Sequence, residues 1–475
     1  MSYFGAHNHS DGSNLGGFKD SICKIKDLIL KAHECGLTGI ALTDHGNLSL
    51  HIKAMNLEKQ LKKEGKIPET FRVVLGVEGY VVNRQVVETA RQTNQPTSFY
   101  HLVMLPKDEV GHRALRELVD ESFLQSFTYR GVLRTPMYQD HVEAVMKKYP
   151  NSLIITTACL GGEVPKRILA YSDALETQNP ALIQSTKQQV CESMEWLIST
   201  FGHENVFMEL QPSEMGDQIA FNQMALKVAN AYQVLPIVAT DTHYLRPEDR
   251  EIHKAFLTSD KKGSQNREVD EFYATTYLHT SDEIRGAFPY LEPEVVETLM
   301  ANTLRIQERC QFFDLSKPQE IPKLPLPPES EWEDVSRFDS LLPNYPFLYE
   351  MATSEEPYNR YFANQVLWGL CEKSIPTEDF HRRLDRINTE CYEILGISEK
   401  RNEVISAYFI TMKETMDWMW EEAETVIGAG RGSVSGYESC FMLGITQLSP
   451  LDYGIEIPHW RFLSKERPEL PDYGI

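Results

Sequence analysis

The first half of this sequence predicts an α/β protein, because strand-like and helix-like segments alternate from residue 1 to about residue 255. Short apolar runs predict the strands, and apolar residues at helical spacing predict the helices that separate most of them. Strands that alternate with helices favour a parallel sheet, either doubly wound or closed into a barrel. In both architectures the functional residues gather where the strands end at their carboxyl termini.

The individual elements follow from these patterns in chain order. Apolar runs predict strands at residues 3–9, 39–43, 72–82, 99–105, 153–157, 206–210 and 235–239. Helical spacing of apolar residues predicts helices at 22–35, 48–63, 109–123, 189–199 and 222–231.

The second half has a different organisation. Residues 250–312 read as mostly helical, and a proline-rich stretch at 318–328 followed by an acidic run at 329–339 reads as a linker or surface crossover. Helical patterns resume at 382–395 and at about 403–424. We therefore expect three parts, with residues 1–255 as an α/β domain, 256–345 as a helical extension and linker, and 346–475 as a further domain.

Composition excludes several classes of protein. At 475 residues and 41% hydrophobic content the chain is long enough for about three domains with real cores. It has no apolar run of membrane-spanning length and no signal-peptide pattern at its amino terminus. The eight cysteines are widely spread without a CxxC pair, which predicts reduced thiols in a cytoplasmic protein.

The formal net charge of −22 is unusual for a protein that binds nucleic acid. A protein that gains its affinity by neutralising phosphates usually carries a basic surface. The acidic balance therefore favours an enzyme acting on small phosphoesters, or a fragment whose basic surface lies elsewhere. Five lysines between residues 53 and 66 form a locally basic run, which is more often a solvated helix face than a binding patch.

Two short motifs at strand edges indicate a metal site. His7 and His9 are two residues apart, and so are Asp241 and His243. Because side chains along a strand repeat every two residues, both members of each pair point the same way and can bind one ion. Either pair alone is a weak signal, but together they predict a polynuclear metal site and hydrolytic phosphate chemistry.

Further candidate ligands lie between these pairs, each with a simpler alternative. Asp44 and His45 follow a predicted buried strand, although Asp44 alone is better explained as a helix N-cap. Glu78 interrupts an apolar run, where a metal or a salt bridge would offset the cost of burying it. His101 and Cys159 could equally be buried core residues, and Cys159 could coordinate as a thiolate.

The order and context of these motifs resemble the PHP (polymerase and histidinol phosphatase) domain at the amino terminus of C-family replicative DNA polymerases, the bacterial-type alpha subunits, in a phage-type form. The matching stretches are HNHS at 7–10, ALTDHGNLS at 41–49, GVEGY at 76–80, YHLVML at 100–105, ACLGGEVP at 158–165, MELQ at 208–211 and VATDTHYL at 238–245. The resemblance implies a distorted (β/α)7 barrel for residues 1–255.

Carried over residue by residue, the family's metal-ligand positions fall on nine residues. They are His7, His9, Asp20, His45, Glu78, His101, Cys159, Asp241 and His243. Asp11 competes with Asp20, because the intervening sequence is similar to the shorter loops of phage-type members. The mixed N, O and S ligand set favours two or three Zn²⁺, Mn²⁺ or Fe ions over Mg²⁺ alone.

The resemblance extends into the last part of the chain. The run TVIGAGRGSVSG at 425–436 is similar to the glycine-rich start of the polymerase palm, which implies that Arg431, Gly432 and Ser433 contact the phosphates of a nucleotide. LGITQLSPLDYGI and WRFLSKERPELPD continue the match. Asp472 corresponds to the first catalytic aspartate that holds Mg²⁺, whereas Gly474 stands where the second is expected.

The resemblance implies the amino-terminal part of a replicative polymerase whose PHP domain is a metal-dependent phosphoesterase, with 3′–5′ exonuclease activity on DNA. We expect no polymerisation from this chain alone, because two-metal catalysis needs carboxylates for both ions. The implied partners are DNA and the remainder of the polymerase, with a sliding clamp bound only through that remainder, and no membrane. A metal-braced scaffold, a small-molecule phosphatase or pyrophosphatase, and a polymerase completed by a second polypeptide remain alternatives.

Overall fold

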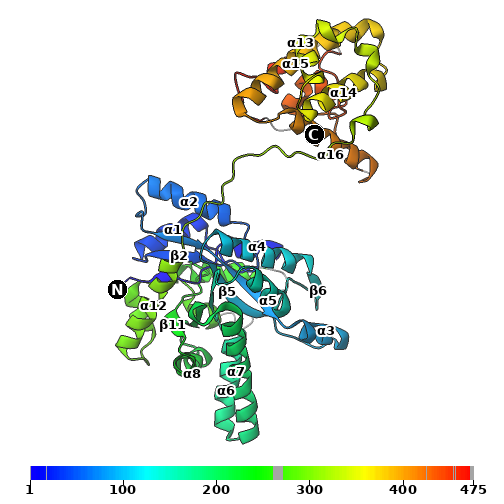
Figure 1. The fold of residues 1–475 in the computed structure, drawn as a ribbon. Helices are drawn as coiled ribbons and strands as arrows, with labels where there is room; N and C mark the ends of the chain where they lie inside the picture. The colour runs from blue at the N-terminus through cyan, green and yellow to red at the C-terminus, as the bar shows by residue number, and fades with distance from the viewer. Residues whose placement is uncertain are drawn as a thin grey trace. The chain divides into compact units, whose positions relative to one another are not determined.

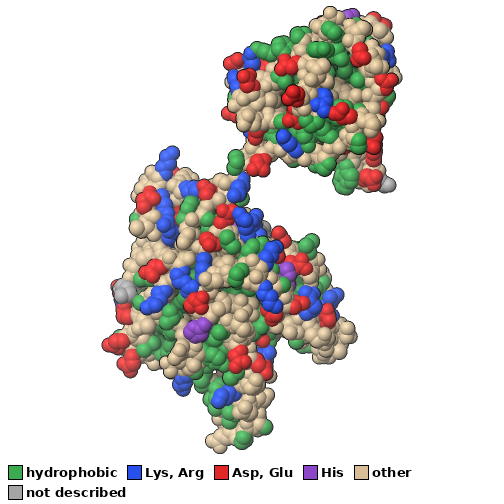
Figure 2. All heavy atoms as spheres, viewed as in Figure 1, with side chains coloured by type: hydrophobic (Ala, Val, Ile, Leu, Met, Phe, Trp, Pro, Cys, Tyr) green, Lys and Arg blue, Asp and Glu red, His purple; other side chains and the backbone are tan. Residues whose placement is uncertain are grey.

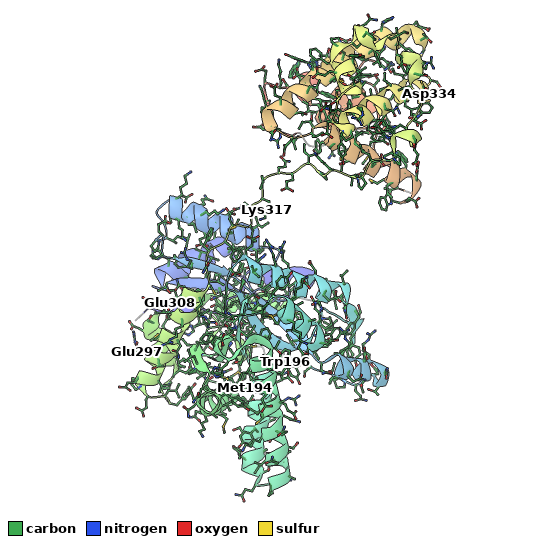
Figure 3. All side chains as sticks on the ribbon, viewed as in Figure 1. Met194, Trp196, Glu297, Glu308, Lys317 and Asp334 are labelled. Carbon is green, nitrogen blue, oxygen red and sulfur yellow. The ribbon has the colours of Figure 1, made fainter. Side chains whose placement is uncertain are left out.

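The computed structural model describes residues 2–17, 19–259, 271–423, 425–452, 454 and 456–470. The chain divides into two compact units, Met1–Ser316 and Lys317–Ile475. Lys317, labelled in Figure 3, begins the stretch that connects them. Residues 311–328, which include the proline-rich stretch, contain neither helix nor strand.

The strands of the first unit form two principal sheets. The smaller is parallel and has the order β1 (Phe4–Gly5), β2 (Gly39–Leu42) and β3 (Arg72–Leu75). The larger has the order β11 (Leu235–Val238), β10 (Val206–Leu210), β9 (Leu153–Thr156), β5 (Tyr100–Pro106), β4 (Val77–Val82) and β8 (Met137–Tyr138).

The two sheets join into a distorted barrel. Strand β3 continues into β4 through Gly76, where an added Cβ would lie 2.8 Å from the Met104 carbonyl oxygen of β5, so only glycine fits. Parallel bridges between Asn8 and Thr242, and between His45 and Glu78, complete the ring where continuous ladders are absent. The PHP-type barrel inferred from the sequence accounts for this mixed α/β arrangement.

The interior of the barrel is a separate apolar cluster. Alternate residues of a strand point to opposite faces, so one set from each strand points inward. The cluster takes residues from β1, β2, β3, β5, β9, β10 and β11, together with Ile306 and Cys310 at the end of α12 (Pro293–Arg309). Its strand members are Phe4, Ala41, Val74, Val103, Leu105, Ile154, Phe207 and Ile237.

Helices cover the outer face of the barrel and bury the other set of strand side chains in a larger core (Figure 1). Those with residues in this core are α1 (Ile25–Glu34), α2 (His51–Lys63), α4 (Glu109–Leu124), α5 (Gln139–Lys148), α6 (Glu163–Thr177), α7 (Pro180–Phe201), α8 (Gly216–Tyr232), α11 (Ser281–Ala287) and α12. The same unit also contains α3 (Arg84–Thr93) and α9 (Arg250–Thr258). Helices α6 and α7 pack side by side as a hairpin.

Two features differ from the purely parallel sheet that alternation predicts. Strand β5 runs antiparallel to both of its neighbours, β4 and β9. The reversal arises because β3 and β4 follow one another in the same direction across one residue, so the chain returns along β5. A hairpin of β6 (Phe127–Tyr129) and β7 (Val132–Arg134) after α4 was also not predicted, because its strands are only three residues long.

The second unit is mainly helical around its own apolar core. Its helices are α13 (Pro346–Ala352), α14 (Pro357–Glu372), α15 (Phe380–Arg401), α16 (Ser406–Glu421) and α17 (Glu438–Met442). The buried guanidinium of Arg383 on α15 pairs with Glu438 and, at 2.9 Å, with Asp452, and so fixes the segments after α16 to α15.

All eight cysteines are free thiols, as the sequence predicts. Within the described ranges, no helix is both long and apolar enough to cross a membrane. Basic and acidic side chains are interspersed on the face seen in Figure 2. In the lysine-rich run, Lys59 and Lys66 pair with exposed carboxylates at 2.6 and 2.7 Å, whereas Lys62 pairs at 2.6 Å with the buried carboxylate of Glu58.

Candidate metal centre

The structure brings all nine predicted ligand positions to one end of the barrel. His7 and His9 follow β1, His45 follows β2, and Asp241 and His243 follow β11. The other four come from the loop before α1, from β4, from β5 and from the loop after β9, and they are Asp20, Glu78, His101 and Cys159. Every one except His45 and His101 is buried.

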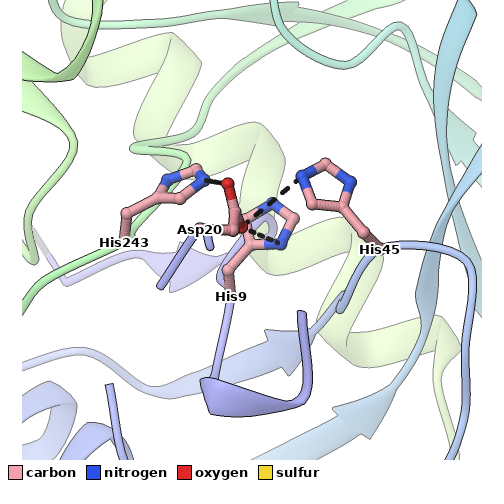
Figure 4. Close-up of side chains that lie close together, drawn as sticks. All are labelled: His9, Asp20, His45 and His243. Carbon is pink, nitrogen blue, oxygen red and sulfur yellow. Dashed lines mark ion pairs between the residues drawn. The ribbon is translucent and has the colours of Figure 1, made fainter. Parts of the chain in front are cut away.

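The first group of ligand-type atoms surrounds Asp20 (Figure 4). Asp20 Oδ1 lies 3.2 Å from His243 Nε2, and Asp20 Oδ2 lies 3.5 Å from His45 Nε2. His9 completes the group, with its Nδ1 3.9 Å from Asp20 Oδ2. Three imidazoles around one carboxylate could hold one divalent ion.

Asp241 lies between the paired histidines of the first strand. Its Oδ1 is 3.2 Å from His7 Nε2 and 3.1 Å from His9 Nε2. Glu78 Oε2 lies 3.3 Å from His9 Nε2, and Glu78 Oε1 lies 3.5 Å from His7 Nε2. The geometry predicted for the His7–His9 pair is therefore present, with both Nε2 atoms facing the same carboxylates.

Glu78 also connects to a third group at the outer side of the cluster. Its Oε2 is 2.9 Å from His45 Nδ1, and its Oε1 is 3.0 Å from His101 Nδ1. Cys159 Sγ lies 3.5 Å from His101 Nδ1. The three groups share His9, His45 and Glu78, so they form one continuous centre.

Unpaired buried atoms test whether this centre fits metal ions. Asp20 Oδ2, Glu78 Oε2, Asp241 Oδ1 and His45 Nδ1 are all buried, and none has a hydrogen-bond partner with acceptable geometry. Burying polar groups without partners is costly, and the cost is largest for charged ones. Each of the three groups has its ligand atoms within 4.8 Å of one another. The residues present therefore fit more than one divalent ion.

A carboxylate that the sequence reasoning missed orients His7. Glu209 of β10 is fully buried, and its Oε1 lies 2.8 Å from His7 Nδ1. Thr156 and Gln211 also donate hydrogen bonds to this carboxylate. If His7 Nδ1 carries the proton, its Nε2 is left free for a metal, which is the usual role of a carboxylate behind a metal-binding histidine.

His9 is oriented in a similar way by a hydroxyl. Ser13 Oγ lies 2.9 Å from His9 Nδ1 and donates at 3.0 Å to Asp44 Oδ1. Asp44 also accepts from the backbone N–H and the hydroxyl of Ser10, at 2.6 and 2.7 Å. Helix α2 begins at His51 without a side-chain cap, so the interpretation of Asp44 as its N-cap is wrong. Asp44 instead holds the loop that carries Ser13.

Electrostatics within the cluster are dominated by the opposed charges. Burial would lower the pKa of His9, but the nearby carboxylates of Asp241 and Glu78 outweigh it and raise the pKa to about 10. Burial would raise the pKa of Asp20, but His243 and His45 hold it well below its usual value. Burial raises the pKa of the Cys159 thiol, so a thiolate there requires a nearby cation.

The geometry separates the two aspartates that competed as ligands. Asp20 lies within the cluster, and the Tyr273 hydroxyl donates to it at 3.4 Å. Asp11 instead pairs with Lys24 at 2.6 Å. Of the two, Asp20 is the one that lies among the other predicted ligands.

Two residues at the centre have left-handed backbone conformations. Asp241 has φ 47° and Ala158, next to Cys159, has φ 58°. Such conformations are disfavoured for residues other than glycine, aspartate and asparagine, and they often occur at functional sites.

The glycine-rich loop lies in the second unit. Arg431 and Gly432 are exposed, and Ser433 is half-buried at the start of a 3₁₀ turn over Gly432–Gly436. Gly430 and Gly432 have φ 110° and 79°, and no atom lies within 4 Å of a Cβ built on Gly432, so the backbone there is open to a ligand. Asp472 lies outside the described residues.

Comparisons with known proteins follow the two units. Residues 6–213 match the PHP domain family, and residues 361–475 match the bacterial DNA polymerase III alpha NTPase domain family. The probable DNA polymerase YorL of Bacillus subtilis (strain 168) is 36% identical over 479 residues, covering 99% of this chain and 36% of that protein. The DNA-directed DNA polymerase of Bacillus phage SPbeta gives the same values.

A third relative is less similar in sequence. DNA polymerase III subunit alpha of Borreliella burgdorferi is 30% identical over 476 residues, covering 99% of this chain and 34% of that protein. The chain therefore spans about a third of the length of the relatives it matches. A putative metal-dependent phosphoesterase from Bifidobacterium adolescentis aligns with 61% of this chain and 96% of its own, at 12% identity and a TM-score of 0.29.

Proposed function

We propose that the buried cluster is a metal-dependent phosphoesterase site that acts on DNA as a 3′–5′ exonuclease. The proposal starts from the matches of this chain to the PHP domain and to a region of the bacterial DNA polymerase III alpha family. The nine clustered residues would hold two or three ions of Zn²⁺, Mn²⁺ or Fe. The observation that carries this proposal is the set of four buried ligand atoms without hydrogen-bond partners, all within one centre.

The chain's own side chains have defined tasks in this proposal. Glu78 lies within 3.5 Å of His7, His9, His45 and His101, so its carboxylate would help to hold the metal ions in all parts of the centre. Glu209 would keep His7 in the tautomer that presents Nε2, and Ser13 would do the same for His9. Divalent ions, when bound, would supply a water of lowered pKa and neutralise charge on the phosphodiester.

The second unit supports the wider assignment. We propose that 1–255 is the phosphoesterase domain, 256–345 an extension and linker, and 346–475 the start of a polymerase palm. Arg431, Gly432 and Ser433 would contact nucleotide phosphates there, and Asp472 would hold Mg²⁺ in the complete polymerase. DNA and the rest of the polymerase would be the partners, and the relatives named DNA polymerase support both.

The decisive experiment offers the Mn²⁺- or Zn²⁺-loaded chain a 5′-labelled single-stranded oligonucleotide, a sugar monophosphate and pyrophosphate. We expect the oligonucleotide to shorten from its 3′ end. Full metal occupancy without cleavage would favour the scaffold, and preferential hydrolysis of a small substrate would favour a small-molecule phosphatase.

A matched pair of variants assigns the activity to the centre. Asp20→Asn removes a carboxylate within the cluster, whereas Asp11→Asn removes a half-exposed one that only pairs with Lys24. We expect Asp20→Asn to lower metal content and activity together, and Asp11→Asn to change neither, since such surface pairs contribute little. Equal behaviour of the two variants would contradict the assignment.

A further inference from the structure

A large pocket opens beside the metal centre. It has a volume of about 560 Å³ and shares Ser13, His45 and Tyr80 with the surroundings of the cluster. Its other walls come from the loop after β2, from α4, and from the β6–β7 hairpin with the residue that follows it. These residues are Gly46, Asn47, Leu48, Ser49, Arg116, Val119, Asp120, Phe123, Leu133 and Thr135.

The pocket begins with an aromatic ring at the cluster. The Tyr80 ring lies parallel to the His45 ring, with centroids 5.5 Å apart and an interplanar angle of 13°. It also meets the His101 ring edge-on at 5.2 Å. A ligand in this pocket is therefore adjacent to two of the predicted metal ligands.

The far walls are apolar and exposed to water. Phe123, near the end of α4, is 49% exposed, and Leu133 of the hairpin is 41% exposed. Leu48 and Val119 add further apolar surface. Exposed apolar side chains that line one concave surface are typical of a binding site, because a ligand there removes them from water.

Polar groups are few and lie among these walls. Asn47, Ser49 and Thr135 offer amide and hydroxyl groups, while Arg116 and Asp120 contribute one charge of each sign. The charges offset one another, so the pocket suits an uncharged ligand with an apolar, planar body and hydrogen-bonding edges. A nucleobase has this chemistry, whereas pyrophosphate or a sugar phosphate would leave the apolar walls in contact with water.

We propose that this pocket binds the nucleobase and sugar of the nucleotide whose phosphate lies at the metal centre. The inference rests on the proposed function and names the part of the substrate that the centre itself does not contact. Stacking against Phe123 and Tyr80 would supply the affinity without a strong base preference, because every base has a π-face. The pocket thereby favours nucleotides over phosphate esters without a base.

The test measures binding to the metal-loaded full chain by calorimetry, with thymidine 5′-monophosphate and 2-deoxyribose 5-phosphate as probes. The two share the deoxyribose 5-phosphate, and the sugar phosphate carries a hydroxyl where the nucleotide carries its base. We expect the nucleotide to bind about fivefold more tightly or better. Phe123→Ala should remove most of that advantage and leave the sugar phosphate unaffected.

Leu124→Ala is the matched control, because Leu124 is the next residue of α4, is 81% exposed and does not line the pocket. It should leave both affinities unchanged. Leu133→Ser changes the opposite wall of the pocket. Like Phe123→Ala, it should weaken binding of the nucleotide and leave binding of the sugar phosphate unchanged. Equal affinities of the two probes for the unmodified chain, or equal effects of Phe123→Ala and Leu124→Ala, would overturn the proposal.

The outcome is separable from that of the proposed function. Hydrolysis of phosphate esters without discrimination for the base would retain the phosphoesterase and reject the pocket. Discrimination for the base without hydrolysis would retain the pocket as a nucleotide site and reject the catalytic role of the centre.

Discussion

Replacing Glu209 tests whether His7 is held for metal binding. His7 Nδ1 and Glu209 Oε1 lie 2.8 Å apart with both side chains fully buried, so neither water nor another group can easily replace this contact. Glu209→Gln keeps the size and one acceptor oxygen but removes the charge. Glu209→Ala removes the contact entirely.

The expected size of the effect follows from this geometry. Losing a carboxylate behind a metal-binding histidine typically costs about 10- to 100-fold in metal affinity. Glu209→Gln should lie near the lower limit, because its amide oxygen can still accept from Nδ1–H, and Glu209→Ala near the upper limit. In excess metal these changes correspond to about 1.4 and 2.7 kcal/mol less metal-linked stability.

The assay is a chelator competition titration with Zn²⁺, together with the melting temperature at fixed metal concentration. Glu214→Gln makes the same chemical change at an exposed position five residues along the chain and should have no effect. If Glu209→Ala bound metal as tightly as the unmodified chain, His7 would not be a ligand that depends on Glu209.

Three further predictions concern other parts of the chain. His9→Ala should abolish hydrolysis and lower the melting temperature of the metal-loaded chain to that of the chelator-treated one, and full activity would rule out the site. Arg431→Ala should leave hydrolysis unchanged in the oligonucleotide assay. A loss of hydrolysis in this variant would show that the two units act together. Burial, with the nearby His112, lowers the pKa of His51 to about 3 in the folded state, against about 6.5 in the unfolded chain. The unfolded state then binds the extra proton below pH 6.5, so stability falls on acidification, by about 2 kcal/mol at pH 5 for this group. Urea unfolding of the chelator-treated chain between pH 7 and 5 should show a flatter dependence in His51→Gln, and parallel curves would contradict this.

Periodicity predicted part of the candidate centre, because several of its residues lie at strand ends. His7 and His9 face the same carboxylates, as a strand repeat of two requires. The positions of Asp20, Glu78 and Cys159 could not be derived from spacing, since they depend on which strands become neighbours. Asp20 was inferred only from the resemblance, whereas the sequence left Glu78 open between a metal and a salt bridge, and Cys159 open between a core residue and a thiolate ligand.

Other parts of the site are less apparent in the sequence. Glu209 interrupts an apolar strand much as Glu78 does, so a buried carboxylate there could have been noticed. The pocket beside the centre could not be predicted from the sequence, because its walls come from a loop, a helix and a short hairpin that only the tertiary fold brings together. The antiparallel direction of β5 could not be predicted either, because it depends on which strands become neighbours in the tertiary fold.

The ring of strands places the first and last ligands of the centre 236 positions apart, at His7 and His243, joined through the bridge between Asn8 and Thr242. No shorter piece of the chain contains the whole ligand set. In the proposed site, the segment with His7 and His9 must therefore wait for β11 during synthesis before the whole set of residues can bind metal. Metal uptake would then indicate that the barrel is complete. A nascent chain that stops before residue 241 would lose its ions to chelators far more readily than the full chain.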